Sequence, residues 1–173
     1  HLMLFNASIE GLFEIDGGQI VPSFASAILA DGISIEGRCF IRNGVEIKGT
    51  VRLANAKIGG EFNMNSARIT QLGEYSLDAR AARIAGAAFL TNGFSATGKV
   101  SFYGAEIGGD CSLYGAQIVS SRDLALDLRA VAVKGSISLG GGFAASGGVS
   151  LYNAGVRGEL NCNGTQISVL KGY

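Results

Sequence analysis

The sequence is 173 residues long and contains 27 glycines, a single proline, no tryptophan and 47% hydrophobic residues. So much glycine disfavours a helical protein and suits a backbone that is stacked tightly and regularly. Lysine and arginine together number 14, as do aspartate and glutamate, so the net charge is zero and attraction to a polyanion is weak. We therefore expect no nucleic-acid partner.

A short pattern of apolar residues recurs along the whole chain. Two apolar positions separated by one residue are followed, after two small or polar residues, by a second such pair. The first full set of four copies covers residues 13–20, 28–35, 39–47 and 51–58. Copies spaced 49 residues apart begin at Phe13, Phe62, Cys111 and Leu160. Such a repeat is typical of a solenoid, in which each unit buries its apolar side against its neighbours.

The spacing of two within each half of the pattern is the period of a β-strand, so the repeated apolar residues face inward. No charged residue occupies a repeated apolar position, and Thr165 is polar at one of them. On this basis Ile107 is an inward residue, and its replacement by Asp should unfold the protein. Lys99 is an outward residue, and Lys99→Asp should be nearly neutral. The third copy has a longer middle, with Asn43 followed by glycine, which predicts a wider corner because asparagine and glycine tolerate positive φ.

Two coil sizes are compatible with this repeat. One copy per coil would give a flattened slot of two sheets with about 12 residues per turn. Two copies per coil would give four sides and room inside for the rings of Phe62, Phe94, Phe102 and Phe143, so we prefer this arrangement. The predicted fold is an all-β, single-stranded parallel β-helix (β-solenoid), right-handed and four-sided, with about 24 residues per coil and a 49-residue superrepeat of two coils. Residues 1–173 are expected to form one such domain, a fragment of a longer repeat protein.

One segment interrupts the rhythm in each superrepeat. These segments are residues 21–27, 70–76 and 119–125, and they differ from one another more than the repeats do. They are either insertion loops that make variable contacts or ordinary wide corners. Phe24, Tyr75 and Arg122 lie in them and are candidate contact residues.

The residues that usually carry chemistry form no recognisable catalytic set. His1 is the only histidine, and the three cysteines occupy repeated apolar positions, where they act as small buried hydrophobes. The glycines at 140–142 align with a solenoid corner, and no helix-forming stretch follows them, as a dinucleotide loop would require. We predict no catalytic residue, no cofactor and no metal site.

Two series of carboxylates recur at the 49-residue interval. Glu61, Asp110 and Glu159 form one, and Asp78 and Asp127 form the other. Members two coils apart would be separated by about 9.6 Å, a distance seen between the carboxylates of inverting glycosidases. Arg80 and Arg129 follow Asp78 and Asp127 by two residues, so local ion pairing on the outer face is the favoured interpretation.

Exposed aromatic residues are the remaining candidates for contact with another molecule. Tyr103 and Tyr152 share an outward register, and Tyr114 occupies the corresponding place in the next copy. They either anchor a partner or form a stripe that covers neighbouring coils.

The segment from Leu77 to Ile118 resembles the repeat of a bacterial family usually labelled "membrane-associated oxidoreductase". The most specific matches are GFSATG at residues 93–98 and AEIGG at residues 105–109, and GFAASG at residues 142–147 is the next copy. The chain is also distantly similar to pentapeptide-repeat proteins. The resemblance implies a bacterial β-solenoid. The label brings no catalytic motif that maps onto a residue of this chain.

The function predicted from the sequence is that of a structural and interaction module. Its outer faces and insertions would contact an unknown protein partner or further copies of the chain. The alternative is a carbohydrate-active or redox enzyme that uses an exposed sheet face. An odd number of cysteines without disulfide or zinc spacing favours a reducing, cytoplasmic location. The uncharged run at residues 135–156 is too rich in glycine for a membrane helix, so membrane association is not supported.

Overall fold

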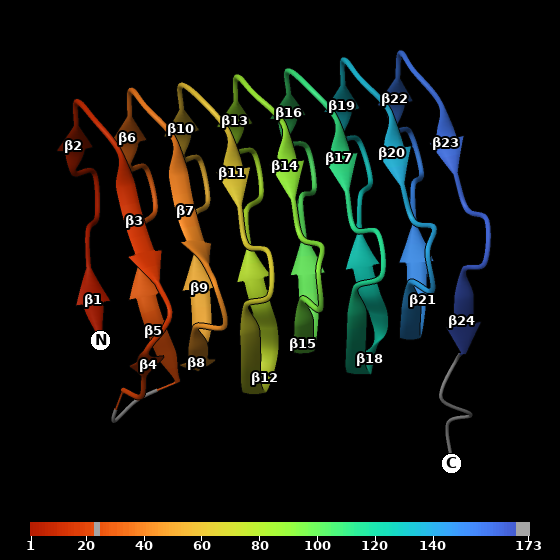
Figure 1. Ribbon diagram of the computed structural model, residues 1–173, viewed down its shortest axis with the longest axis horizontal. Helices are drawn as coiled ribbons and strands as arrows, with labels where there is room; N and C mark the ends of the chain where they lie inside the picture. Colours follow the sequence, from red (N-terminus) through yellow and green to blue (C-terminus); the bar gives the residue numbers. More distant parts are fainter. Residues whose placement is uncertain (23–24, 169–173) are drawn as a thin grey trace.

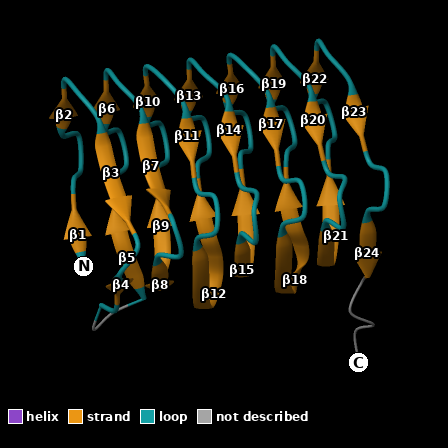
Figure 2. Ribbon diagram, viewed as in Figure 1, coloured by secondary structure: helices purple, strands orange, loops and turns teal. Residues whose placement is uncertain are grey.

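The computed structural model describes residues 1–22 and 25–168, apart from the side chains of residues 71, 72 and 122. In this part of the chain short parallel strands alternate with turns, as Figure 2 shows. Within the same ranges no helix could cross a membrane. The strands stack along one axis as a β-solenoid of about 7 turns, which confirms the predicted fold class.

The strands form three sheets, seen as rows in Figure 1. Sheet A contains β1 (Leu2–Met3), β4 (Gln19–Ile20), β5 (Ser26–Leu29), β8 (Glu46–Lys48), β9 (Thr50–Arg52), β12 (Arg68–Asp78), β15 (Ser95–Ser101), β18 (Gln117–Asp127), β21 (Ala144–Ser150) and β24 (Gln166–Ser168). Sheet B contains β2 (Ser8–Ile9), β6 (Ser34–Ile35), β10 (Lys57–Ile58), β13 (Arg83–Ile84), β16 (Glu106–Ile107), β19 (Ala132–Val133) and β22 (Gly155–Val156). Sheet C contains β3 (Phe13–Asp16), β7 (Cys39–Arg42), β11 (Phe62–Asn63), β14 (Ala88–Phe89), β17 (Cys111–Ser112), β20 (Ile137–Ser138) and β23 (Leu160–Asn161).

The pairing register gives the length of each coil. Leu2 pairs with Ile28, 26 residues on, and Ile28 pairs with Val51, 23 residues on. The same alternation continues to Leu77 and Val100. Two successive coils therefore make up the 49-residue superrepeat, and a flattened 12-residue coil is excluded.

Four inward ladders line the interior, although there are only three sheets. Sheets B and C each supply one ladder, and sheet A supplies two. The two ladders of sheet A belong to one sheet because β12, β15, β18 and β21 continue round the corner between them. Ile69 and Leu77, for example, lie on the same strand β12 but on different sides of the coil. The predicted four sides are present.

The interior is filled by the residues of the apolar pattern. Phe62, Phe94, Phe102 and Phe143 are all fully buried, as their predicted need for volume requires. The rings of Phe62 and Phe102 meet edge to face, with their centroids 6.3 Å apart. At the wider corner Asn43 has a φ of 58°, which confirms the left-handed conformation expected there.

Two of the three cysteines are buried as predicted. Cys39 and Cys111 have no exposed surface, and burial raises the pKa of each thiol to about 12. For Cys162 the prediction is wrong, because its side chain is exposed. It lies in the last described coil, where no further coil covers the inward position.

Two of the three predicted insertions are wide corners, and the remaining one, residues 21–27, lies partly outside the described residues. Residues 70–76 and 119–125 lie inside the long strands β12 and β18, where the register with the neighbouring strand shifts. Figure 1 shows that β12 and β18 reach further at the lower edge of sheet A than β15 and β21 do. In the alternate coils Gly98 and Gly147 turn this corner with φ values of 127° and 121°. These segments are therefore wide corners of sheet A.

Candidate functional site

Polar residues line up on the outer side of sheet A. Each directly follows an inward residue of one ladder, so the two-residue period of the strand points it outward. The pairing register places Arg52, Asp78, Ser101, Asp127 and Ser150 in successive coils. Asp78, Ser101 and Asp127 are nevertheless almost completely buried. A buried carboxylate needs partners, and the corner that follows the strand provides them.

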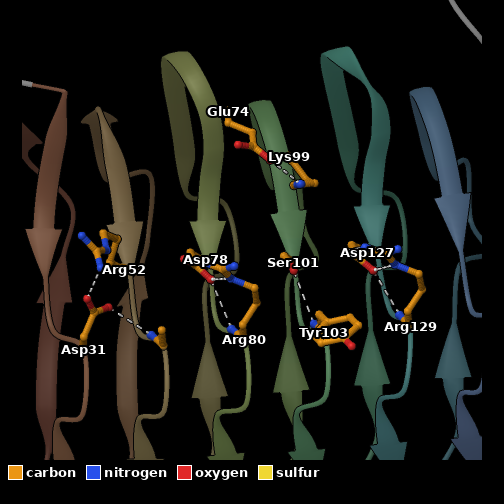
Figure 3. Close-up of polar contacts among 11 residues, drawn as sticks. Asp31, Arg52, Glu74, Asp78, Arg80, Lys99, Ser101, Tyr103, Asp127 and Arg129 are labelled. Carbon is orange, nitrogen blue, oxygen red and sulfur yellow. Dashed lines mark hydrogen bonds and ion pairs between the residues drawn. The ribbon is translucent and has the colours of Figure 1, made fainter.

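Each buried aspartate is held by the arginine two residues later. Arg80 donates to Asp78 from Nε at 2.7 Å and from Nη2 at 2.8 Å. Arg129 donates to Asp127 from the same two atoms, both at 2.8 Å. The arginine backbone N–H also donates to the carboxylate in each case. Figure 3 shows the two pairs in line along the rod. These bidentate, charge-assisted hydrogen bonds fix the arginine guanidinium groups in position.

Between the two pairs, Ser101 takes the place of the aspartate. Its Oγ accepts a hydrogen bond from the backbone N–H of Tyr103 at 3.3 Å. In these successive coils the strand residue accepts a hydrogen bond from the backbone N–H two residues later. The residue at that later position is arginine in one coil and tyrosine in the next. This alternation follows from the superrepeat of two coils.

The protonation of the Asp127–Arg129 pair reflects these contacts. Burial acts to raise the pKa of Asp127, but hydrogen bonds from the side chain and backbone of Arg129 outweigh it and lower that pKa below its ordinary value of 3.8. The same hydrogen bond raises the pKa of Arg129. The pair is fully ionised at neutral pH.

Arginine and tyrosine alternate along this corner of the rod. The backbone N–H groups of Ala81, Gly104 and Ala130 donate to the carbonyl oxygens of Tyr103, Arg129 and Tyr152, each at 2.9 Å. We call the four residues in successive coils, Arg80, Tyr103, Arg129 and Tyr152, the Arg–Tyr ladder. Tyr103 is 46% exposed and Tyr152 is 72% exposed. The Arg129 guanidinium carbon lies 5.4 Å from the centre of the Tyr103 ring, so cation and ring reinforce each other.

The insertion in β12 packs against the start of this ladder. The ring centre of Tyr75 lies 4.9 Å from the Arg80 guanidinium carbon and 4.1 Å from Lys99 Nζ. Lys99 also donates to Glu74 Oε1 at 2.7 Å, a contact drawn in Figure 3. Burial acts to lower the pKa of Lys99, but Glu74 and Tyr75 outweigh it and raise the pKa above 10.5. Glu74 and Tyr75 of the insertion thus pack against this corner and contact both cations.

Lys99 is therefore not the free outward residue expected from the repeat. Only 9% of its surface is exposed, and its ammonium group is engaged by the insertion. We now expect Lys99→Asp to be destabilising rather than nearly neutral, because an aspartate there would face Glu74 in a partly desolvated place. The repeat gives the direction of the side chain but not what folds over it.

The predicted contact residues are distributed over different parts of the rod. Tyr103 and Tyr152 share the Arg–Tyr ladder, and Tyr75 packs beside it. Phe24 lies outside the described residues, as does the side chain of Arg122. The sequence pattern did not single out Arg80 and Arg129 as contact residues, because each follows an aspartate by two residues and was interpreted only as a local ion-pair partner. Their shared 49-residue interval was the available signal.

Tyr114 lies at another corner and covers its own chain. The backbone N–H of Gly115 pairs with Gly140, so Tyr114 lies beside the glycine-rich corner of the next coil. A Cβ on Gly141 would lie 2.1 Å from the Tyr114 ring. Half of the tyrosine is still exposed. The interpretation as a stripe over neighbouring coils fits Tyr114, and the glycines at 140–142 form a corner as predicted.

Two members of the other carboxylate series accept hydrogen bonds from neighbouring groups of the solenoid. Glu61 and Asp110 are two coils apart, with Ala87 between them in the hydrogen-bond ladder. Asp110 accepts from the backbone N–H of Ser136 at 2.8 Å, and Glu61 accepts from Asn63 Nδ2 at 2.7 Å. In the described ranges no three histidine, cysteine, aspartate or glutamate side chains gather as metal ligands would.

Comparisons of the chain with protein-family models, with curated proteins and with solved structures found no match.

Proposed function

We propose that this chain is a structural and interaction module, a rigid rod that presents its outer faces and insertions to a protein partner or to further copies of itself. The observation that carries the proposal is the Arg–Tyr ladder. Its four side chains stand in successive coils, about 4.8 Å apart along the axis. Arginine and tyrosine are the side chains most enriched, with tryptophan, among residues that dominate binding energy at protein interfaces.

Three of the four ladder residues are held in place before any partner arrives. Arg80 and Arg129 are each fixed by two hydrogen bonds to a buried aspartate, and Tyr103 is stacked against Arg129. A surface whose side chains are already ordered loses less conformational entropy on binding. The backbone beneath them is a closed stack of parallel ladders, so the spacing of the contact residues is fixed by the fold.

The experiment that tests the proposal uses light-induced cross-linking. Tyr152 is replaced by a photoreactive phenylalanine analogue, and the labelled chain is irradiated in an extract of its source cells. We expect a discrete cross-linked protein whose yield falls when Tyr103→Ser is added. The matched control carries the same analogue at Tyr114, which packs on its own chain and should give no such product. Equal products from both positions would refute a binding surface at the Arg–Tyr ladder.

A further inference from the structure

The outer face of sheet B carries two parallel rows of side chains. The first outer ladder consists of Ser8, Ser34, Lys57, Arg83, Glu106, Ala132 and Gly155. The second outer ladder lies two positions further along each coil and consists of Glu10, Glu36, Gly59, Ala85, Gly108, Lys134 and Arg157. The first row lies on the strands of sheet B, the upper row of strands in Figure 1, and each member of the second row directly follows one of these strands.

The second outer ladder reverses its charge about its centre. It begins with two glutamates, continues with three small residues and ends with two cations. Ala85 is the middle member, so reversing the row places the two glutamates where the two cations were. Within residues 1–22 and 25–168, no ion pair or side-chain hydrogen bond engages Glu10, Glu36, Lys134 or Arg157. These four charges face solvent.

The first outer ladder has its centre on the same coil. Arg83 is its middle member, flanked by Lys57 on one side and Glu106 on the other. Reversing the row therefore brings Lys57 opposite Glu106. Arg83 and Glu106 already form a long pair of 3.5 Å within the chain, with both side chains about two-thirds exposed. That contact is weak enough for either group to take a new partner.

The middle of the face is hollowed. A shallow depression of about 960 Å³ runs along this face from β6 to β22, and Gly59, Ala85 and Gly108 form the central part of its lining. The two glycines are required by the fold, because a Cβ at either would lie 2.0 Å from a backbone oxygen of the preceding coil. Ala85 has no such requirement, and its small size keeps the centre open. The longer Lys57, Arg83 and Glu106 side chains also line the depression.

We propose that this face binds a second copy of the chain, with the two rods antiparallel and a twofold axis crossing β13. Glu36 then faces Lys134 of the second copy, Glu10 faces Arg157, and Lys57 faces Glu106. Twofold symmetry forms each of these pairs twice. The depressions of the two copies then face each other, and the Arg83 side chains of the two copies meet at the axis, each beside the Glu106 of its own chain. Such a self-complementary surface is what an isologous dimer requires.

Other occupants fit the face less well. A parallel pair of rods would set Glu36 against Glu36 and Lys134 against Lys134, so like charges would repel. A polyanion would meet Glu10 and Glu36 at one end of the row, and a polycation would meet Lys134 and Arg157 at the other. The proposal rests on the chain being an interaction module but uses a different face from the Arg–Tyr ladder.

Sedimentation velocity at low ionic strength tests the charge pairing. We expect a wild-type dimer that dissociates as salt screens the pairs. Glu36→Lys and Lys134→Glu should each weaken association by about tenfold or more, because each places like charges together twice. The double variant Glu36→Lys/Lys134→Glu restores opposite charges and should restore the dimer. A monomer at all concentrations, or a dimer unaffected by either single reversal, would overturn the proposal.

Cross-linking tests the position of the twofold axis. In a Cys162→Ser background, Ala85→Cys faces its own counterpart and should be joined to it by a short bismaleimide. The matched control is Ala132→Cys, which is exposed like Ala85 but lies about 19 Å from its counterpart along the axis by strand spacing. Equal cross-linking of both would exclude this geometry. Tyr103→Ser/Tyr152→Ser should leave the dimer intact, so loss of the partner and loss of the dimer are separate outcomes.

Discussion

The rod carries two kinds of charged surface. Along the outer side of sheet A the aspartates are desolvated and tied to arginine, so that only 4% of the Asp78 side chain and 3% of the Asp127 side chain is exposed. On the outer face of sheet B the charges stand in water, and the Arg83–Glu106 pair exposes about two-thirds of each side chain. The same repeat supports both surfaces.

The difference shows what each set of charges contributes. A desolvated carboxylate is costly to leave unpaired, so Asp78 and Asp127 constrain the corner and the arginines that follow it. An exposed charge adds little to stability, so the residues of sheet B are free to vary and to meet another molecule. The desolvated aspartates of sheet A organise the corner and orient the arginines above it, whereas the exposed charges of sheet B depend on no partner within the chain.

The largest difference in stability is expected between two neighbouring residues of one strand. On β16 Ile107 is buried and Glu106 is exposed. We expect Ile107→Asp to lower the free energy of unfolding by more than about 4 kcal/mol, because it buries an unpaired carboxylate. Glu106→Ala should stay within about 0.5 kcal/mol of wild type. Chemical denaturation of both variants measures the difference, and equal midpoints would disprove the inward register.

A second prediction compares one arginine from each surface. Arg129→Met removes the side-chain partner of buried Asp127 and should cost about 1–3 kcal/mol. Arg157→Met removes an exposed arginine of sheet B and should change stability by about 0.5 kcal/mol or less. Thermal unfolding at pH 7 gives both values. If the two variants melt together, the Asp127–Arg129 pair has no structural role.

The interior could be predicted from the sequence in detail, because it depends only on a two-residue period and a 49-residue interval. Phe62 and Ile107 are placed correctly by that rule. The repeat offsets of 23 and 26 residues already align Arg80, Tyr103 and Arg129, but nothing in the pattern shows that the aspartates beneath the arginines are buried. Nor does it show that the Tyr103 ring lies against Arg129, because both facts depend on how the corner packs in three dimensions.

Long-range packing explains the errors as well. Lys99 obeys the outward period, but the insertion in β12 folds over it and brings Glu74 and Tyr75 into contact. The exposure of Cys162 depends on the absence of a covering coil in the described structure. Neither fact is contained in the local pattern. The charge reversal of sheet B is visible in the sequence only after the register aligns Glu10, Glu36, Lys134 and Arg157.

Lowering the pH should reduce the stability contributed by Asp127 on sheet A, and we expect this effect to be smaller than those of the substitutions above. Because the folded protein holds the pKa of Asp127 below 3.8, its carboxylate stabilises the fold above that pH, and this contribution is lost as pH falls through the folded pKa. Melting temperature measured from pH 7 to pH 2 should therefore decline less steeply for Asp127→Asn than for wild type. Glu36→Gln on sheet B serves as the control and should follow the wild-type slope. Identical slopes for all three proteins would show that Asp127 gains nothing from Arg129.

The smallest effect is expected for the one ion pair that sheet B does form. A double-mutant cycle with Arg83→Ala and Glu106→Ala should give a coupling energy of about 0.5 kcal/mol or less in the monomer, because both groups are exposed and 3.5 Å apart. The cycle is measured by chemical denaturation in high salt, where the proposed dimer is dissociated. A coupling above about 1 kcal/mol would place this pair with the organising charges of sheet A. A small value leaves Glu106 free to face Lys57 of a second copy, which is the role that its position beside the twofold axis gives it.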